Sequence, residues 1–402
     1  MAVRVTTGIS GVGPAVKRRL TSEEVAVLRV ALFDGGTGLQ GPSLGRLQFG
    51  SSFIFDPFLA YDAGLVSNPN VLVTGAIGVG KSSLVKMLLA RGLQSGRRAV
   101  VMDPKGEYGD LAREHGGVVV TLGGDQGNWT SPFTGELRDD LSLAESFLGA
   151  ARGRPLADDE RFALETAWVL SGAALSPRPL RSLLDVLGRR LAEVAPSPER
   201  ELAYTVRRLV DGDLAGLFDG AQPVSAPDGS LVVLDLSASW ATDEFALCAL
   251  AAMALSRRLL EGPRAGYLVV DEAWAVLVDP RVAHWLHGSW KLARARATSH
   301  VLVLHRWSDA FAVADQGSAQ RTKATGILRD CDTCFLFRQD PGELHLLDEV
   351  IRLHSRERDY LVSLPRGVAL ARYGPHRSVV RVEPDEADRR IIDTDQAMRA
   401  AP

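Results

Sequence analysis

The sequence predicts an α/β fold, with a mostly parallel central sheet that is interrupted by an all-α insertion domain. Two observations indicate this. Short apolar runs alternate with helical patterns before residue 135 and again after residue 229, which is typical of a parallel sheet. Between these parts strand patterns stop, and apolar residues recur at helical spacing. We therefore expect a lead-in segment at 1–48, a discontinuous core at 49–135 and 229–395, and a helical domain at 136–228.

The lead-in segment and the first part of the core differ clearly in how their apolar residues are spaced. Residues 1–48 are Gly-rich and weakly patterned, and only Thr21–Phe33 could form a short helix or strand. Val71–Thr74 is an apolar run directly before several glycines, as expected for a buried parallel strand. Apolar residues then recur at helical spacing from Leu84 to Leu89. The next expected strands are residues 98–102 and 117–122.

The insertion and the second part of the core follow. Amphipathic stripes at Leu180–Val194 and Leu202–Val210 predict two helices, which prolines at 177, 179, 196 and 198 separate from their surroundings. An Ala- and Leu-rich helix is expected at about 245–260. The later predicted strands are residues 231–236, 266–270, 300–304 and 334–337, with a strand pair at 367–373 and 378–382.

Composition excludes several classes of protein. The 402 residues carry a net charge of −3, which excludes a globally basic nucleic-acid coat but leaves a local basic channel open. Three cysteines are too few for a secreted disulfide scaffold and indicate a reducing compartment. No apolar run approaches the roughly 20 residues that a membrane-spanning helix needs, so we expect no direct membrane span.

The most specific chemical signal is the run GAIGVGKSS, which fits the phosphate-loop pattern GxxxxGK[ST] between a strand and a helix. Glycines let backbone N–H groups curl around phosphate oxygens, and the dipole of the following helix favours the same anion. Lys81 can reach the β- and γ-phosphates, and Ser82 can ligate Mg²⁺. The alternative is a glycine-rich turn that carries a lysine by chance. The predicted nucleotide-binding residues are Gly75, Ala76, Ile77, Gly78, Val79, Gly80, Lys81, Ser82 and Ser83.

A second signal is the apolar run Tyr267–Val270, which ends in Asp271 and Glu272. Alone, such a run is most often structural, but downstream of a phosphate loop it has a catalytic interpretation. The first acid holds the Mg²⁺ shell, and the second polarises a water for attack on the γ-phosphate. The sequence therefore predicts ATP and Mg²⁺ as cofactors, with Ser82 and Asp271 at the metal and Glu272 as the base.

Further residues resemble a known family. Val101–Tyr108 lies at the end of the strand after the phosphate-loop helix, and with Asp271–Trp274 it resembles the hexameric motor ATPases of the HerA/FtsK class. The most similar member is the conjugation and type IV secretion ATPase known as the fourth VirB component. The resemblance covers roughly residues 45–395 and implies a RecA-like P-loop core. Other agreeing segments are Ser131–Phe133, Leu217–Gly220, Leu234–Ser237, Ile327–Leu328, Leu336–Gln339 and Gly367–Leu370.

The resemblance also implies roles for single residues. Arg294 lies eleven residues before His305, the spacing at which the class has an arginine that reaches the neighbouring subunit's nucleotide. Arg338 is the rival candidate, and Arg294 could simply solvate a helix or loop. The class usually has glutamine where His305 stands, which affects hydrolysis and subunit coupling more than nucleotide binding. Asp103 and Glu107 are candidate supporting acids near the Mg²⁺ or the subunit interface, although either could cap a helix start.

Cys331 and Cys334 form a single CxxC pair. A zinc site needs further ligands, and a redox pair normally opens a helix, whereas this pair leads into an apolar run. We expect two buried structural thiols.

Three functions stay open. The favoured one is an ATP-hydrolysing motor that energises conjugative transfer or type IV secretion of macromolecules through an envelope channel. The first alternative is a HerA/FtsK-like DNA translocase or coupling protein. The second is a nucleotide-dependent assembly switch with little turnover. The resemblance implies a homo-oligomeric ring, a hexamer, that acts with membrane secretion-channel proteins on DNA or a protein substrate. It also implies a cytoplasmic location, peripheral at the inner face of the cell membrane.

Overall fold

The computed structural model describes most of the chain between residues 36 and 392. The predicted element at Thr21–Phe33 and the segment Leu217–Gly220 lie outside the described residues. The described ranges are 36–123, 131–173, 176, 179–191, 195–215, 230–240, 242, 244–312 and 319–392.

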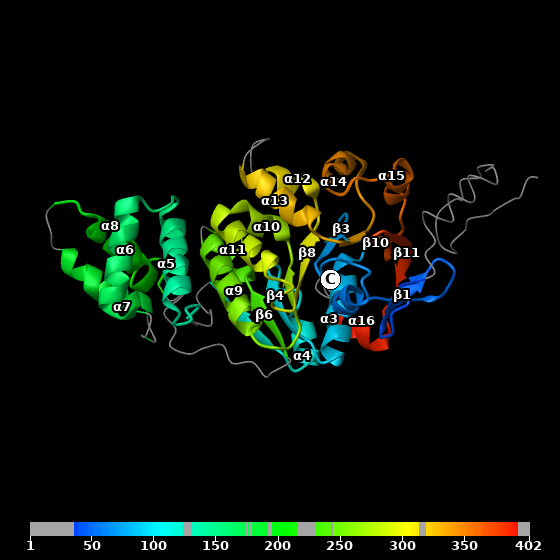
Figure 1. The fold of residues 1–402 in the computed structure, drawn as a ribbon, viewed down its shortest axis with the longest axis horizontal. Helices are drawn as coiled ribbons and strands as arrows, with labels where there is room; N and C mark the ends of the chain where they lie inside the picture. The colour runs from blue at the N-terminus through cyan, green and yellow to red at the C-terminus, as the bar shows by residue number, and fades with distance from the viewer. Residues whose placement is uncertain are drawn as a thin grey trace, which may run out of the picture.

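One large twisted sheet organises the described residues (Figure 1). Its order is β2-β1-β11-β10-β9-β3-β8-β7-β4-β6-β5. The strands from β9 to β5 run parallel, and the four at the other edge run antiparallel. The parallel strands are β9 (Thr333–Leu336), β3 (Val71–Thr74), β8 (Thr298–Leu304), β7 (Gly266–Val270), β4 (Arg98–Asp103), β6 (Leu231–Asp235) and β5 (Val118–Thr121). The mostly parallel sheet and all its predicted strands are confirmed.

The antiparallel edge contains two strands that the sequence pattern did not reveal. It comprises β1 (Ser43–Leu47), β2 (Ser52–Ile54), β10 (Val368–Tyr373) and β11 (His376–Val382). We predicted a lead-in segment through residue 48, whereas β1 pairs with β11 and is part of the sheet. Gly45 interrupts the alternation of β1, and a Cβ there would lie 2.0 Å from the Arg381 carbonyl oxygen. The close approach of β1 to β11 therefore requires glycine at position 45. That same glycine breaks the alternating pattern by which a strand is recognised in the sequence.

Helices cover both faces of the sheet and bury two apolar clusters. One face carries α3 (Lys81–Gln94), α4 (Gly109–Glu114) and α16 (Glu386–Ile392). The other carries α9 (Phe245–Leu259), α10 (Ala273–Val278), α11 (Pro280–Lys291), α12 (Trp307–Ala312), α13 (Ala319–Arg329) and α14 (Leu344–Ile351). Two further helices are α2 (Pro57–Asp62) and α15 (Ser355–Leu361).

Four helices between β5 and β6 form a group at one end of the molecule, beyond α9 and α11 (Figure 1). They are α5 (Leu137–Arg152), α6 (Asp158–Ser171), α7 (Pro179–Leu187) and α8 (Pro198–Val210). The predicted stripe at Leu180–Val194 ends early as an α-helix, because α7 passes at Gly188 into a 3₁₀ turn. The Trp285 indole of α11 donates to the Ser146 hydroxyl of α5 at 3.2 Å and links this group to the core.

The register of the parallel strands brings the predicted site residues to one edge. Thr74 lies opposite both Leu304 and Leu336, and Met102 lies opposite Val270. The residues that follow these positions therefore leave the sheet at the same carboxyl edge, where α/β proteins bind ligands.

Candidate active site

The phosphate loop connects β3 to α3 and is held in shape by its glycines. Gly78 and Gly80 have φ angles of +74° and +107°, a region that favours glycine. A Cβ on Gly75 would lie only 2.7 Å from the Phe337 Cβ. Two backbone hydrogen bonds fasten the loop, from Ala76 N to the Arg338 carbonyl (2.8 Å) and from Gly367 N to the Val79 carbonyl (2.9 Å). The ends of β9 and β10 thus fix the loop conformation.

Lys81 is the first residue of α3 and is almost fully buried. Its Nζ donates to the Gly75 and Ala76 carbonyls, both at 2.6 Å. Burial lowers the Lys81 pKa to about 7, although Asp271 and Glu272 act in the opposite direction. Because no side chain caps α3, its first N–H groups are available to an anion. Ser82 and Ser83 are partly buried in that first turn.

Asp271 directly follows β7 and is buried. Its Oδ1 accepts the Glu272 N–H at 2.9 Å, while its Oδ2 is buried without a hydrogen-bond partner among the described residues. Burial raises the Asp271 pKa to about 7, with Lys105 opposing this shift. A divalent cation would satisfy the open carboxylate oxygen and favour its ionised form. The open oxygen of Asp271 therefore fits an Mg²⁺ ion, and Ser82 remains the predicted second ligand.

Glu272 has a left-handed backbone conformation, with φ +47° and ψ +48°, at the start of α10. Its side chain is buried and has three partners. Oε2 accepts from the Trp274 indole N–H at 2.7 Å, and Oε1 contacts the Lys105 ammonium and His305 Nε2, the latter at 3.2 Å. A positive φ at a residue with a Cβ is strained, and such strain clusters at functional sites. The three side-chain contacts hold the Glu272 carboxylate in one orientation.

His305 follows β8 and lies beside Glu272. Burial, followed by the charges of Lys81 and Lys105, lowers its pKa to about 3, so the imidazole is neutral at pH 7. The Glu272 contact is satisfied when Nε2 carries the hydrogen, which makes Nδ1 an acceptor. That Nδ1 is buried and has no hydrogen-bond partner within the described part of the chain.

Lys105 was not selected from the sequence, although it lies within the Val101–Tyr108 segment. Its Nζ contacts Glu272 and is 3.2 Å from His305 Nε2. Burial acts to lower the Lys105 pKa, but the hydrogen bond and charge of Glu272 leave it raised. The low number of lysines is the sequence signal that could have identified Lys105. The chain has six lysines, and three of them, Lys81, Lys86 and Lys105, come from the segments that form this site. Lys86 instead donates to the Ile391 carbonyl at 2.9 Å and has a structural position.

The two predicted supporting acids differ in their surroundings. Asp103 is buried at the end of β4, where it accepts the N–H groups of Lys105 (3.2 Å) and Tyr108 (2.8 Å). Burial raises the Asp103 pKa, while these backbone bonds oppose that shift. Asp103 therefore shapes the loop that presents Lys105. Glu107 is partly buried, and its charge acts on Lys81 and Asp271.

The two candidate arginines lie at different edges of the sheet. Arg294 is exposed in the turn before β8, at the opposite end of that seven-residue strand from His305. At about 3.3 Å per residue, the strand separates them by roughly 20 Å. Arg338 is also exposed, but its carbonyl bonds to Ala76 beside the phosphate loop. One chain thus brings together Lys81, Asp271, Glu272 and His305 and leaves Arg294 outside the group.

Cys331 and Cys334 are buried free thiols, as predicted. Burial raises the pKa of Cys334 to about 12 and that of Cys331 well above its ordinary value. Both are therefore protonated and unreactive at pH 7. No group of metal ligands of the His, Cys, Asp or Glu type was found in the described residues.

Comparisons with known proteins bear on the fold. Residues 66–170, which include the phosphate loop, match a family model described as the central domain of helicase HerA. The structure of VirB4 of Thermoanaerobacter pseudethanolicus aligns with a TM-score of 0.74 and 22% identity, covering 89% of this chain and 100% of that one. No curated protein matches the chain.

Two structures of the plasmid coupling protein TrwB are also similar. The complex with ADP and Mg²⁺ has a TM-score of 0.54 and 18% identity, covering 79% of this chain and 85% of that one. The complex with the ATP analogue ADPNP has a TM-score of 0.55 and 17% identity, covering 87% and 94%. These matches confirm the resemblance to the HerA/FtsK class, and the fold is the RecA-like P-loop fold of VirB4 and TrwB.

Proposed function

We propose that the chain binds ATP with Mg²⁺ and hydrolyses it. One observation carries this proposal: an uncapped helix start, a buried lysine and two buried acids converge at the carboxyl edge of the sheet. Anion binding by backbone N–H groups, metal ligation by Asp271 and base action by Glu272 each need a group that is present at this edge. Ligand complexes of TrwB, which shares the fold, support the choice of nucleotide and metal.

Each residue has a defined part in the proposed reaction. The loop N–H groups and Lys81 bind the phosphates, and Ser82 and Asp271 hold Mg²⁺, which neutralises phosphate charge when it is bound. Glu272 orients the attacking water and accepts its proton. Lys105, Trp274 and His305 are positioning residues, since they hold the Glu272 carboxylate in place. Asp103 and Glu107 support this arrangement from the β4–α4 loop.

We further propose that the ATPase is a homo-oligomeric motor, assembled as a hexameric ring. Arg294 is the candidate for the group that reaches a neighbouring nucleotide, because it is exposed and too far from its own loop. Arg338 remains the rival for this role. Hydrolysis would move the helical insertion, 136–228, relative to the core. The motor would energise conjugative transfer or type IV secretion, in contact with membrane secretion-channel proteins at the inner face of the cell membrane. The similarity to the VirB4 structure, all of whose solved chain aligns with this one, supports this system.

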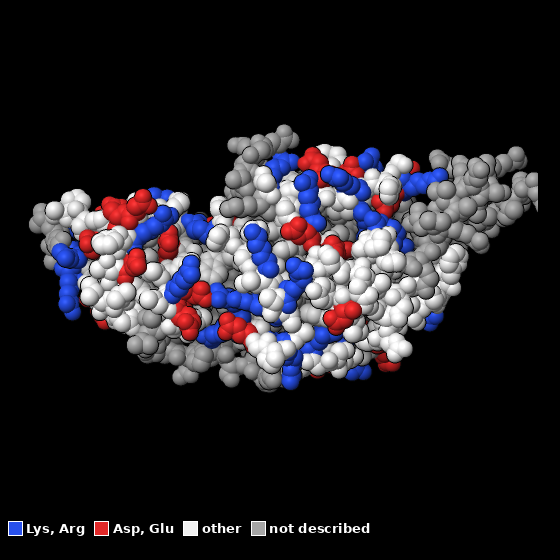
Figure 2. Space-filling view, in the orientation of Figure 1, with Lys and Arg blue, Asp and Glu red and all other residues white. Residues whose placement is uncertain are grey.

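A second candidate function is DNA translocation, which the match to the HerA central domain favours. Such a motor needs a basic surface that follows the nucleic acid. Figure 2 shows lysines and arginines interspersed with acids, with no continuous basic stripe on the face in view. We therefore rank DNA translocation below secretion. No helix in the described ranges combines the length and apolar character needed to cross a membrane.

Steady-state ATP hydrolysis by four chains tests the proposal. The unmodified chain should hydrolyse ATP, and Glu272→Gln should bind ATP but lose turnover by about 10²–10⁴-fold, the usual contribution of a general base. Lys81→Ala should lose nucleotide binding itself. Lys291→Ala, which removes an exposed lysine from α11, is the matched control and should behave like the unmodified chain.

The readouts separate the hypotheses. ATP binding by calorimetry and oligomeric state by light scattering are measured on the same samples, because turnover that needs a neighbouring arginine depends on assembly. Full activity in Lys81→Ala would refute the phosphate-loop assignment. Tight binding without turnover in an assembled oligomer would instead favour the assembly switch.

A further inference from the structure

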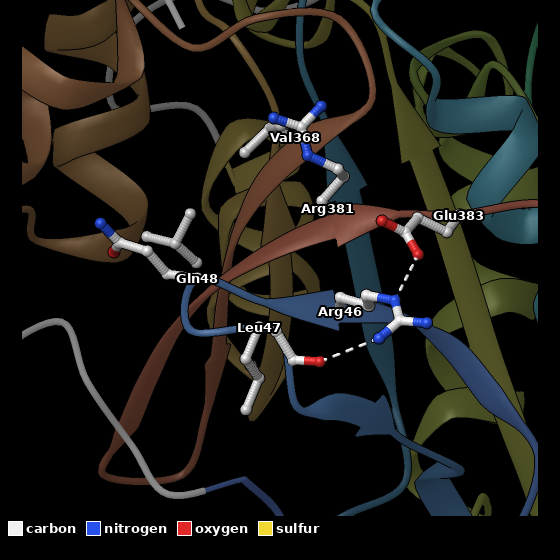
Figure 3. A pocket seen from close by; sticks show the side chains of 8 residues that line it. Arg46, Leu47, Gln48, Val368, Arg381 and Glu383 are labelled. Atoms are coloured by element: carbon white, nitrogen blue, oxygen red, sulfur yellow. Dashed lines mark hydrogen bonds and ion pairs between the residues drawn. The ribbon is translucent and has the colours of Figure 1, made fainter. Parts of the chain in front are cut away.

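A pocket of about 200 Å³ lies on the antiparallel edge of the sheet, between β1, β10 and β11 (Figure 3). None of the proposed catalytic groups lines it. Its lining includes Arg46, Leu47, Gln48, Val368, Arg381 and Glu383.

The pocket wall at Val368 directly follows Gly367, and Gly367 contacts the phosphate loop. Gly367 N donates to the Val79 carbonyl at 2.9 Å, and a Cβ on Gly80 would lie 3.4 Å from the Gly367 Cα. The next residue, Val368, forms part of the pocket wall, and consecutive Cα atoms are 3.80 Å apart. A molecule whose phosphates occupy the loop therefore has this pocket as a neighbour.

The strand register groups the polar lining. Val368 lies opposite Arg381, which in turn lies opposite Arg46 on the next strand. Arg46 is already engaged, through Nε with Glu383 Oε2 (2.9 Å) and through Nη1 with the Gly50 carbonyl (3.1 Å). Figure 3 shows the Arg381 guanidinium directed away from that ion pair. Its Nη2 is buried and has no hydrogen-bond partner among the described residues.

The lining combines what a nucleoside needs. Leu47, Val368 and Val379 offer apolar contact to a flat base or a sugar ring. Gln48 carries an amide that both donates and accepts, and Arg381 has the unsatisfied donor. An acceptor on the ligand would remove the penalty of that buried donor.

We infer that this pocket binds the nucleoside part, base and ribose, of the nucleotide whose phosphates occupy the loop. Arg381 and Gln48 supply its polar contacts. The inference deepens the proposed function and depends on it, because the loop must first hold the phosphates.

The test compares two ligands that share phosphates and differ in the nucleoside. Binding of ATP and of inorganic tripolyphosphate, each with Mg²⁺, is measured by calorimetry on the full chain. Arg381→Ala should bind ATP roughly tenfold more weakly, as expected for one lost hydrogen bond to a charged donor, and should bind tripolyphosphate unchanged. Gln48→Ala, at a partly buried position after β1, should show the same selective loss. Arg390→Ala removes an exposed arginine from α16 and is the matched control.

Other outcomes overturn the inference in distinguishable ways. The inference is wrong if both pocket variants leave ATP binding unchanged, or if they weaken the binding of ATP and tripolyphosphate equally. The nucleoside then lies elsewhere, while the assignment of the phosphate loop is unaffected. If the unmodified chain binds neither ligand, the proposed function itself fails, and this inference fails with it.

Discussion

At the scale of single residues, the site is assembled from side chains whose charge states are set by burial. Lys81 and Asp271 both have a pKa near 7, one lowered and one raised, because the site removes water from both. A phosphate anion and a metal cation would each restore the ionised form. Glu272 has Lys105 as a direct countercharge. The acid proposed as base is thus the one that the protein itself keeps paired with a cation.

The clearest pH effect on stability comes from His300, inside β8. Its ring is fully buried between Asn70 (Nδ1 to Oδ1, 3.1 Å) and Ser289 (Nε2 to Oγ, 2.8 Å), and burial lowers its pKa to about 3. In the unfolded chain the pKa is about 6.5. Between these values the unfolded state binds the extra proton, so the free energy of unfolding falls as the pH falls. From pH 7 to pH 5 this one group should lower it by about 2 kcal/mol.

Urea unfolding at pH 7 and pH 5 measures this contribution. His300→Gln should reduce the difference between the two pH values by about 2 kcal/mol, even if it lowers stability at both. The exposed His284→Gln is the control, because its ring is in water whether the chain is folded or not. An undiminished difference in His300→Gln would contradict the assignment.

At the scale of elements, the close pairing of β1 with β11 sets the shape of the antiparallel edge. Gly45→Ala should destabilise the protein by at least about 2 kcal/mol, because its Cβ would meet the Arg381 carbonyl oxygen at 2.0 Å and φ is +154°. Gly288→Ala is the matched control, since a Cβ there meets no atom within 4 Å and alanine favours the α11 helix. Chemical denaturation of both variants tests this, and equal stabilities would show that the edge can relax.

The elements also show how far the sequence could predict this protein. The parallel strands and the phosphate loop were predictable, because apolar runs next to glycine signals reflect local physics. The strands β1 and β2 were missed because short edge strands with Gly45 lack the alternating pattern. Lys105 was missed for another reason: its contact with Glu272 joins the ends of two strands that are distant in sequence. Only the sheet register brings these ends together.

At the scale of the whole molecule, the position of Arg294 requires a second copy if it is to act on a nucleotide. It lies about 20 Å from its own His305, at the opposite sheet edge. Arg294→Ala should therefore keep ATP binding and lose turnover by about 10³-fold or more, as for other arginines that act in trans.

Mixing two inactive chains tests the trans role directly. In a mixture of Glu272→Gln and Arg294→Ala chains, some interfaces combine an intact Glu272 with an intact Arg294. Turnover should reappear in the mixture and be absent from either chain alone. Unchanged turnover in Arg294→Ala would exclude this residue and make Arg338 the candidate, and inactive mixtures would argue against a shared site.

The indole of Trp274 has a consequence for following the reaction in real time. It donates a hydrogen bond to Glu272, and its ring meets Trp240 edge-on, with centroids 5.7 Å apart. Any rearrangement of that carboxylate alters the electric field at a natural fluorophore. The chain thus contains an intrinsic optical reporter, and stopped-flow emission can follow the acid through the proposed reaction without an added dye.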